Sequence, residues 1–142
     1  MSSNASIGAN FENAFCKMLK NHGFWALRII PNAGGQQPAD IIAVKGRYTA
    51  LIDCKVISTK RGFPFYRVED NQLTAMEQFL KITKEPGWFA IRLDDGEIRM
   101  LGEDEIAWAL LGGENSFSQE ELRSDKTMSL TDWLERAETK CT

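Results

Sequence analysis

The sequence contains a single histidine, His22, among its 142 residues. This scarcity excludes sites that need two histidines, such as the HExxH zinc motif. The three cysteines, Cys16, Cys54 and Cys141, form no CxxC pair, and their odd number argues against a disulfide framework. We therefore expect a reduced protein inside a cell, in the cytoplasm or in a virus-infected host cell.

Long apolar runs and nucleotide motifs are also missing. No run of 18 apolar residues occurs, so we expect no membrane association. Residues 1–10 lack a basic segment followed by an apolar one, so we expect no secretory signal. The absence of GxxxxGK[ST] predicts no nucleotide cofactor. With 43% hydrophobic and 26% charged residues, the chain is expected to be globular, with a single core.

Acidic residues are scarce in the first half of the chain. Residues 1–67 hold nine Lys or Arg and three acids, a balance of +6, whereas residues 68–142 have a balance of −9. This asymmetry indicates a surface for a polyanion on the first half, with the acidic half on the far side. The alternative is chance clustering of charge on a solvated surface.

The hydrophobic periodicity predicts helices packed on a mixed central sheet, an α/β fold. The expected elements are a helix at 11–22, strands at 24–30, 39–44 and 49–57, a helix from Asp70 to Leu80, and strands at 88–93 and 97–101. Residues 59–67 are expected to form a loop that interleaves basic and aromatic side chains. This pattern gives a core over residues 1–102, and the order is helix, three strands, helix, two strands.

Residues 103–142 are predicted to form an acidic helical C-terminal extension. A helix is expected at 103–111, and a second helix is expected after a capping box that begins at Ser129. Because the candidate site described below ends at Gln72, we expect a chain cut after Gly112 to keep its chemistry. Three tryptophans, Trp88, Trp108 and Trp133, could be either core residues or anchors of an interface.

Two aspartates are expected to face each other across the first hairpin. With Gly46 and Arg47 as its tight turn, paired residue numbers sum to 93, as those of Asp40 and Asp53 do. Their Cβ atoms would lie about 4.5–5.5 Å apart. Lys55, two residues beyond Asp53, points to the same face.

Like charges opposed across a ladder destabilise it, so something must offset this pair. A divalent cation such as Mg²⁺, the nearby ammonium group of Lys55, or a proton on one carboxylate would do so. The alternative is that the two acids are surface charges on edge strands. The continuous apolar runs at 41–44 and 51–52 argue instead for strands covered on both faces.

These residues carry a resemblance to a known group of enzymes. Pro38-Ala39-Asp40 followed by Asp53-Cys54-Lys55 resembles the active-site motif of the PD-(D/E)XK nuclease superfamily. Glu12 matches the additional acid of many members, and Gln72 matches their helix-borne glutamine. Over residues 8–80 the chain is most similar to the archaeal-type Holliday-junction resolvases. The resemblance implies a restriction-endonuclease-like core.

The resemblance also implies a metal-dependent endodeoxyribonuclease that hydrolyses phosphodiester bonds in branched DNA. Mg²⁺ is the implied metal, with Mn²⁺ able to substitute. The implied metal ligands are Glu12, Asp40, Asp53 and the main-chain carbonyl of Cys54. Lys55 would position or activate the attacking water, and Gln72 would orient the water or the phosphate. The residues expected to bind DNA are Arg28, Lys45, Lys60, Arg61, Tyr66 and Arg67.

Cutting a four-way junction symmetrically requires two sites, so we expect a homodimer with twofold symmetry. The sequence leaves two alternatives open. One is a restriction-like or replication-repair nuclease acting on flaps or duplexes. The other is a noncatalytic DNA-binding protein that keeps the fold. One departure from the usual motif is Asp53, which stands where glutamate is more frequent.

Overall fold

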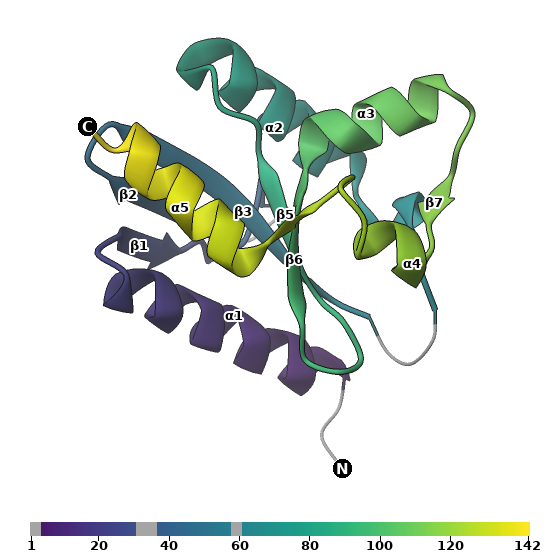
Figure 1. Ribbon diagram of the computed structural model, residues 1–142, viewed down its shortest axis with the longest axis horizontal. Coiled ribbons are helices and arrows are strands. Elements are labelled where there is room, and N and C mark those ends of the chain that lie inside the picture. The colour runs from purple at the N-terminus through teal and green to yellow at the C-terminus, as the bar shows by residue number, and fades with distance from the viewer. Residues whose placement is uncertain (1–3, 31–36, 58–60) are drawn as a thin grey trace.

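The computed structural model describes residues 4–30, 37–57 and 61–142 (Figure 1). The helices are α1 (Asn4–Asn21), α2 (Asp70–Thr83), α3 (Glu103–Leu111), α4 (Gln119–Leu122) and α5 (Leu130–Lys140), with a 3₁₀ turn η1 (Phe65–Arg67). The strands are β1 (Trp25–Arg28), β2 (Ile41–Lys45), β3 (Tyr48–Val56), β4 (Phe63–Pro64), β5 (Trp88–Arg92), β6 (Ile98–Gly102), β7 (Ser116–Phe117) and β8 (Met128–Ser129). Within these residues, no helix is both long and apolar enough to span a membrane.

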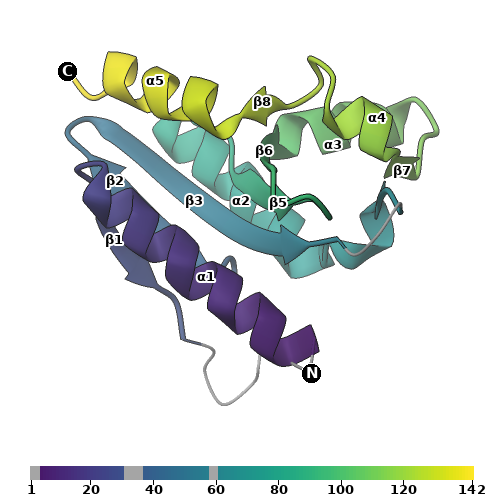
Figure 2. The ribbon, with the colours of Figure 1, turned by 60° about the horizontal axis from the view of Figure 1, so that its bottom comes forward.

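One sheet forms the centre of the molecule, in the strand order β1-β2-β3-β5-β6-β8. The β3–β5 pair is parallel and the other neighbours are antiparallel, so the sheet is mixed, as predicted. Figure 2 shows α1 and α2 on opposite sides of β3. The sheet therefore lies between two helical layers, and the expected α/β class is confirmed.

Each face of the sheet has its own apolar core. Alternate residues of β3 point to opposite faces: Ala50 and Ile52 belong to the core beneath α1 and α5, and Leu51 to the core beneath α2 and α3. The continuous apolar run in this strand thus reflects burial on both faces, as the sequence predicted.

The first hairpin has the predicted register, with Ile41 paired to Ile52. Gly46 has a φ of +56°, a conformation that favours glycine. A Cβ at this position would lie 2.1 Å from the carbonyl oxygen of Cys141, which accepts a hydrogen bond from the Arg47 amide. The C-terminus of the chain is therefore docked on this turn.

Two local predictions are corrected by the structure. The expected loop at 59–67 contains β4 and η1 in its described part, because Phe63 and Phe65 are buried beside Phe89 and Phe117. Helix α2 is capped by Glu69 rather than by Asp70, which is its first helical residue.

The region after residue 102 is more than a helical extension. It contributes β7, which pairs with β4, and β8, which joins the central sheet beside β6. Ser129 caps α5 by accepting from the Asp132 amide, which is one half of the predicted capping box. Trp133 is fully buried against Phe24 and Trp88, so the region completes the first core. A cut after Gly112 would remove Trp133 from this core, and the expectation that such a chain keeps its chemistry stays a prediction.

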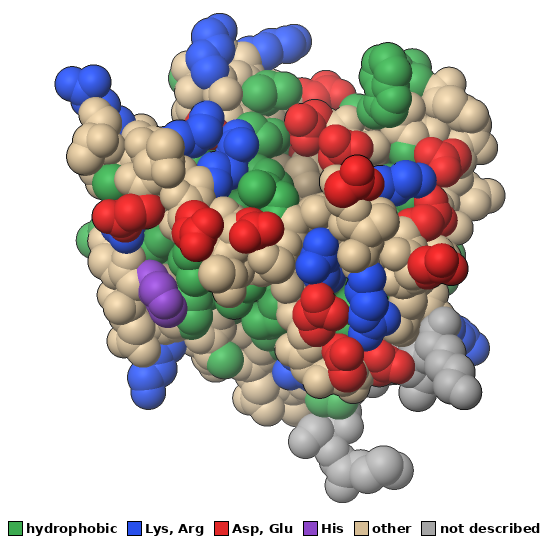
Figure 3. Space-filling view, viewed as in Figure 1, with side chains coloured by type: hydrophobic (Ala, Val, Ile, Leu, Met, Phe, Trp, Pro, Cys, Tyr) green, Lys and Arg blue, Asp and Glu red, His purple; other side chains and the backbone are tan. Residues whose placement is uncertain are grey.

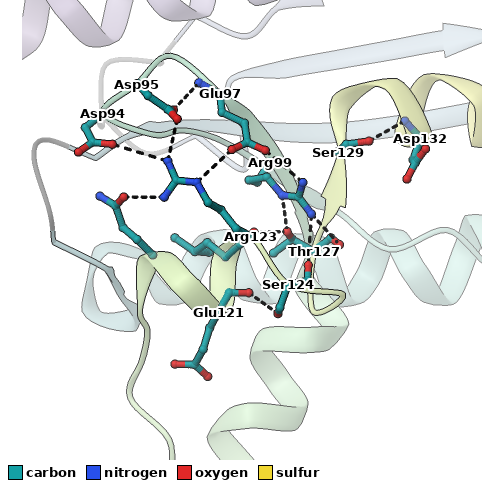
Figure 4. Close-up of polar contacts among 12 residues, drawn as sticks. Asp94, Asp95, Glu97, Arg99, Glu121, Arg123, Ser124, Thr127, Ser129 and Asp132 are labelled. Atoms are coloured by element: carbon teal, nitrogen blue, oxygen red, sulfur yellow. Dashed lines mark hydrogen bonds and ion pairs between the residues drawn. The ribbon is translucent and has the colours of Figure 1, made fainter.

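An ionic network fastens α4 to the turn between β5 and β6 (Figure 4). The Arg123 guanidinium donates to Glu97 at 3.1 Å and to Asp95 at 3.0 Å. On β6, Arg99 donates to the Thr127 hydroxyl at 2.9 Å and to the Ser124 carbonyl at 3.2 Å. These contacts join the segment after α3 to a strand of the central sheet.

We predict that Trp133→Ala lowers the free energy of unfolding by about 3–5 kcal/mol, because it leaves a large cavity among packed rings. Trp108→Ala is the matched control: Trp108 is 75% exposed, so its change should stay within about 0.5 kcal/mol. Urea unfolding of both variants measures the difference. Equal effects would contradict the assignment of the region after residue 112 to the core.

Candidate active site

The candidate site lies where β3 continues beyond β2. Residues 53–56 of β3 have no β2 partner, because the pairing ends at Ile52. Asp40, just before β2, replaces the missing strand partner of Cys54, because its Oδ2 accepts a hydrogen bond from the Cys54 amide at 2.8 Å. The strand mismatch therefore brings Asp40 and Asp53 to one place, as the register predicted.

The backbone of Cys54 also faces this place. The N–H and C=O of one residue in an extended strand point to the same side, so the carbonyl follows the amide toward the end of β2. The side chain packs into the first core instead, and burial raises the pKa of the thiol well above its usual range. Cys54 can thus offer a carbonyl oxygen to the site, while its side chain packs away from it.

Asp53 is 1% exposed and is held from two sides. Its Oδ1 accepts a hydrogen bond from Gln72 Nε2 at 2.9 Å, and its Oδ2 lies 3.1 Å from Lys55 Nζ. Within the described residues, no hydrogen bond of good geometry reaches Oδ2. One carboxylate oxygen thus accepts a hydrogen bond from the protein, and the other lies beside the Lys55 ammonium group.

Gln72 connects this carboxylate to the start of α2. Its Oε1 accepts from the Glu69 amide at 3.2 Å, as one half of a capping box, while its Nε2 donates to Asp53. Gln72 is buried, so its amide is committed at both ends. These contacts show that Gln72 orients Asp53. The role toward water or phosphate that the resemblance implied stays a prediction.

Glu12 reaches the site from α1. Its Oε2 lies 3.4 Å from an Arg28 nitrogen, and its carboxyl group interacts with Asp40. Arg28 stands at the end of β1 and also donates to the Asn13 side chain. The three predicted acids therefore come from three elements: α1, the start of β2, and β3.

Two of these acids have raised pKa values, first because of burial and then because acids lie close together. Partial burial, followed by the neighbouring Asp40, raises the pKa of Glu12 to about 7. Burial and Asp40 raise the pKa of Asp53 to about 8, against the lowering effect of Lys55. Each acid resists ionisation first because it is buried and then because Asp40 lies beside it. The site therefore favours a cation.

Two site residues were missed by the sequence analysis. They are Gln37 and Asn71. Gln37 Nε2 donates to Asp40 Oδ1 at 2.7 Å, and the main-chain carbonyl of Gln37 accepts from the Asn71 side chain at 3.0 Å. The available signal was position alone, because Gln37 immediately precedes Pro38 in the predicted motif. Together with Cys54, Gln37 holds both oxygens of Asp40.

A groove of about 860 Å³ opens beside the site. It is lined by Lys55 and by three of the predicted DNA-binding residues, Arg61, Tyr66 and Arg67. Tyr66 is 85% exposed, whereas Arg67 also donates to the Val56 carbonyl at 3.0 Å. The opposite wall comes from β7 and α4 and includes Glu121, so the acidic half is not wholly on the far side.

The remaining predicted DNA-binding residues are placed differently. Lys45 is at the far end of β2 from Asp40, where it donates to the His22 carbonyl at 2.8 Å and pairs with Glu138. The structure therefore does not bring Lys45 to the site. Lys60 lies outside the described residues.

Comparisons with known proteins bear on this site. The family model of the archaeal Holliday junction resolvase (Hjc) matches residues 3–141. The chain belongs to this family. Membership confirms the predicted resemblance and the predicted activity, that of a Holliday junction resolvase.

A solved structure supports the resolvase fold independently. The chain is similar to the Hjc Holliday junction resolvase of Archaeoglobus fulgidus, an archaeal hyperthermophile. The TM-score is 0.68 at 16% identity, over 89% of this chain and 99% of the other. At this identity the likeness shows the fold, and it confirms the restriction-endonuclease-like core. The comparison with curated proteins gives no match.

Resolvases of this family depend on a metal, so the fit of this site to a metal matters. Across the described ranges, no three acidic, histidine or cysteine side chains are already arranged to hold an ion. Instead the three carboxyl groups contact basic and amide side chains of the protein, namely Arg28, Gln37, Gln72 and Lys55. The donor set nevertheless fits a hard cation, because it is all oxygen and because the buried Asp53 Oδ2 has no hydrogen bond from these residues.

We predict that Gln72→Ala destabilises the resolvase by about 1–3 kcal/mol, because a buried Asp53 oxygen loses its donor. Gln78→Ala, at an exposed position of the same helix, should change stability by less than about 0.5 kcal/mol. Urea unfolding gives both values. If both variants matched the wild type in stability, the Gln72–Asp53 hydrogen bond would contribute nothing to the free energy of unfolding.

Proposed function

We propose that this resolvase cuts DNA four-way junctions at a site beside the start of β2, with Mg²⁺ held by Glu12, Asp40, Asp53 and the Cys54 carbonyl. The observation that carries the assignment is the gap beside β3, where two aspartates and Lys55 meet. Mn²⁺ would substitute, because it also accepts oxygen ligands. Bound there, the metal would supply a water of lowered pKa and stabilise charge on the phosphate oxygens.

The ammonium group of Lys55 has the central role among the protein groups. It lies 3.1 Å from Asp53 Oδ2 and lines the groove, so one group touches both the acid site and the space for DNA. There it orients the attacking water and offsets the negative charge that develops on the phosphate. Its position is fixed by Asp53, which Gln72 orients in turn.

The groove supplies the binding surface for the DNA backbone. Arg61 and Arg67 contact phosphates on the side of Lys55, and the exposed Tyr66 ring is placed to stack on an unpaired base near the branch. Phe63 and Phe65 are buried beneath this surface, so they support it without contacting DNA. We also propose that Lys60 contacts a phosphate, on the basis of its place in the sequence next to Arg61.

Symmetric cutting of a four-way junction favours a twofold dimer of this chain. Of the three tryptophans considered as anchors, Trp88 and Trp133 are core residues and Trp108 is exposed. We expect light scattering to give about twice the chain mass of 16.0 kDa. A monomeric species that cuts both opposed strands of a junction in one binding event would contradict the dimer.

We predict that Asp53→Asn abolishes junction cleavage in Mg²⁺ while leaving DNA affinity equal or higher, because the carboxylate both holds the metal and repels phosphate. Asp125→Asn, an exposed change of the same chemistry, is expected to cut normally. Gel assays of cleavage and binding, with unfolding curves for both variants, give the answer. Near wild-type cutting by Asp53→Asn would refute the site.

The substrate preference needs its own measurement. Four-way junction, flap and linear duplex of equal length should be compared at one enzyme concentration and one salt concentration. We expect the junction to be cut fastest. Faster cutting of the flap or the duplex would leave the nuclease chemistry in place and overturn the proposed substrate.

A further inference from the structure

A second groove lies on the other side of Glu12, between α1 and the edge strand β1. Its volume is about 660 Å³, and its lining includes Arg28, which pairs with Glu12, but none of the proposed metal ligands and not Lys55. The lining residues are Asn13, Cys16, Lys17, Lys20, Ala26, Leu27, Arg28, Ile29 and Ile30. Figure 2 shows the second half of α1 beside β1, the two elements that supply most of these lining residues.

The charge of this groove is of one sign. Lys17 and Lys20 are exposed and lie three residues apart, so they project from the same side of α1. Among residues 4–30, Glu12 is the single acid, and it is already paired with Arg28. Within the described residues, neither lysine has an ion-pair partner. The two ammonium groups are therefore available to an anionic ligand.

Helix α1 connects the two grooves through the active site. Its first turns contribute Ile7 and Gly8 to the groove of Lys55, its middle contributes Glu12 to the acids, and its second half contributes Lys17 and Lys20. The rise from residue 8 to residue 20 is about 18 Å. A DNA strand carries one phosphate per about 3.4 Å of axis, so this path corresponds to about five nucleotides.

We propose that the groove between α1 and β1 binds the DNA backbone beyond the scissile phosphate, on the side opposite to the Lys55 groove. Lys17 and Lys20 contact phosphates from α1, beside the edge strand β1. The scissile phosphate then sits between two basic grooves, which holds the DNA on both sides of the cut. This inference rests on the proposed nuclease site.

The test is the salt dependence of junction binding by Lys17→Gln/Lys20→Gln. Each lost phosphate contact lowers the slope of log affinity against log salt concentration by about 0.9. We expect the double variant to lower the slope by about 2 and to weaken binding at least tenfold in low salt. Lys81→Gln/Lys84→Gln is the matched control, because these exposed lysines also lie three residues apart, on the opposite layer. Its slope should equal that of the wild type.

Arg61→Gln separates the inference from the proposed function. If Arg61→Gln lowers the slope by about 1 and the Lys17/Lys20 variant does not lower it, the second groove is refuted and the first stands. If neither changes the slope, the proposed DNA surface fails as a whole. Unfolding curves identify any variant that is merely misfolded, and both surface variants should melt like the wild type.

A second measurement locates the contact on the DNA. The cut position is mapped on the wild-type junction, and the arm is then shortened by five base pairs on one side of the cut at a time. Shortening on one side should weaken wild-type binding but leave the Lys17/Lys20 variant unchanged, because that variant has already lost the contact. Equal weakening of wild type and variant on both sides would overturn the proposal.

Discussion

The site depends on one mismatch in strand length: β3 extends four residues past the last residue paired with β2. An unpaired backbone amide in a buried strand is unfavourable, and here the Asp40 carboxylate accepts from the amide of Cys54. The same bond fixes Asp40 next to Asp53. One hydrogen bond therefore both pairs the Cys54 amide and brings the two aspartates together. Glu12 and Lys55 are useful to the site only because this pair of aspartates is in place.

The side chains around these acids neutralise part of their negative charge and still leave them able to bind a metal. Arg28, Lys55 and two glutamine amides each contact one carboxyl group, yet the pKa values of Glu12 and Asp53 remain raised. The protein thus tolerates a cluster of acids in a nearly buried place and still favours an added cation. The two grooves beside the cluster carry basic side chains, so attraction of DNA is separated in space from binding of metal.

The C-terminal region has a structural role that its composition conceals. It adds β8 to the sheet, covers the first core with Trp133, and builds one wall of the groove next to Lys55. Arg123 fixes that wall to the turn between β5 and β6. A segment rich in exposed acids is therefore part of the nuclease fold. Figure 3 shows acidic side chains spread over the face on which α4 and α5 lie.

The sequence by itself determined the alternation of helix and strand, the register that opposes Asp40 and Asp53, and the identity of the acids. These follow from local periods and from a two-residue turn, which act over short stretches of chain. Tertiary structure alone decided that Gln72 serves Asp53, that Gln37 serves Asp40, that Lys45 lies far from the site, and that Trp133 is core while Trp108 is surface. Those outcomes depend on which face of the sheet each distant helix covers and on where β2 stops, and neither is encoded by the spacing of residues within a single segment.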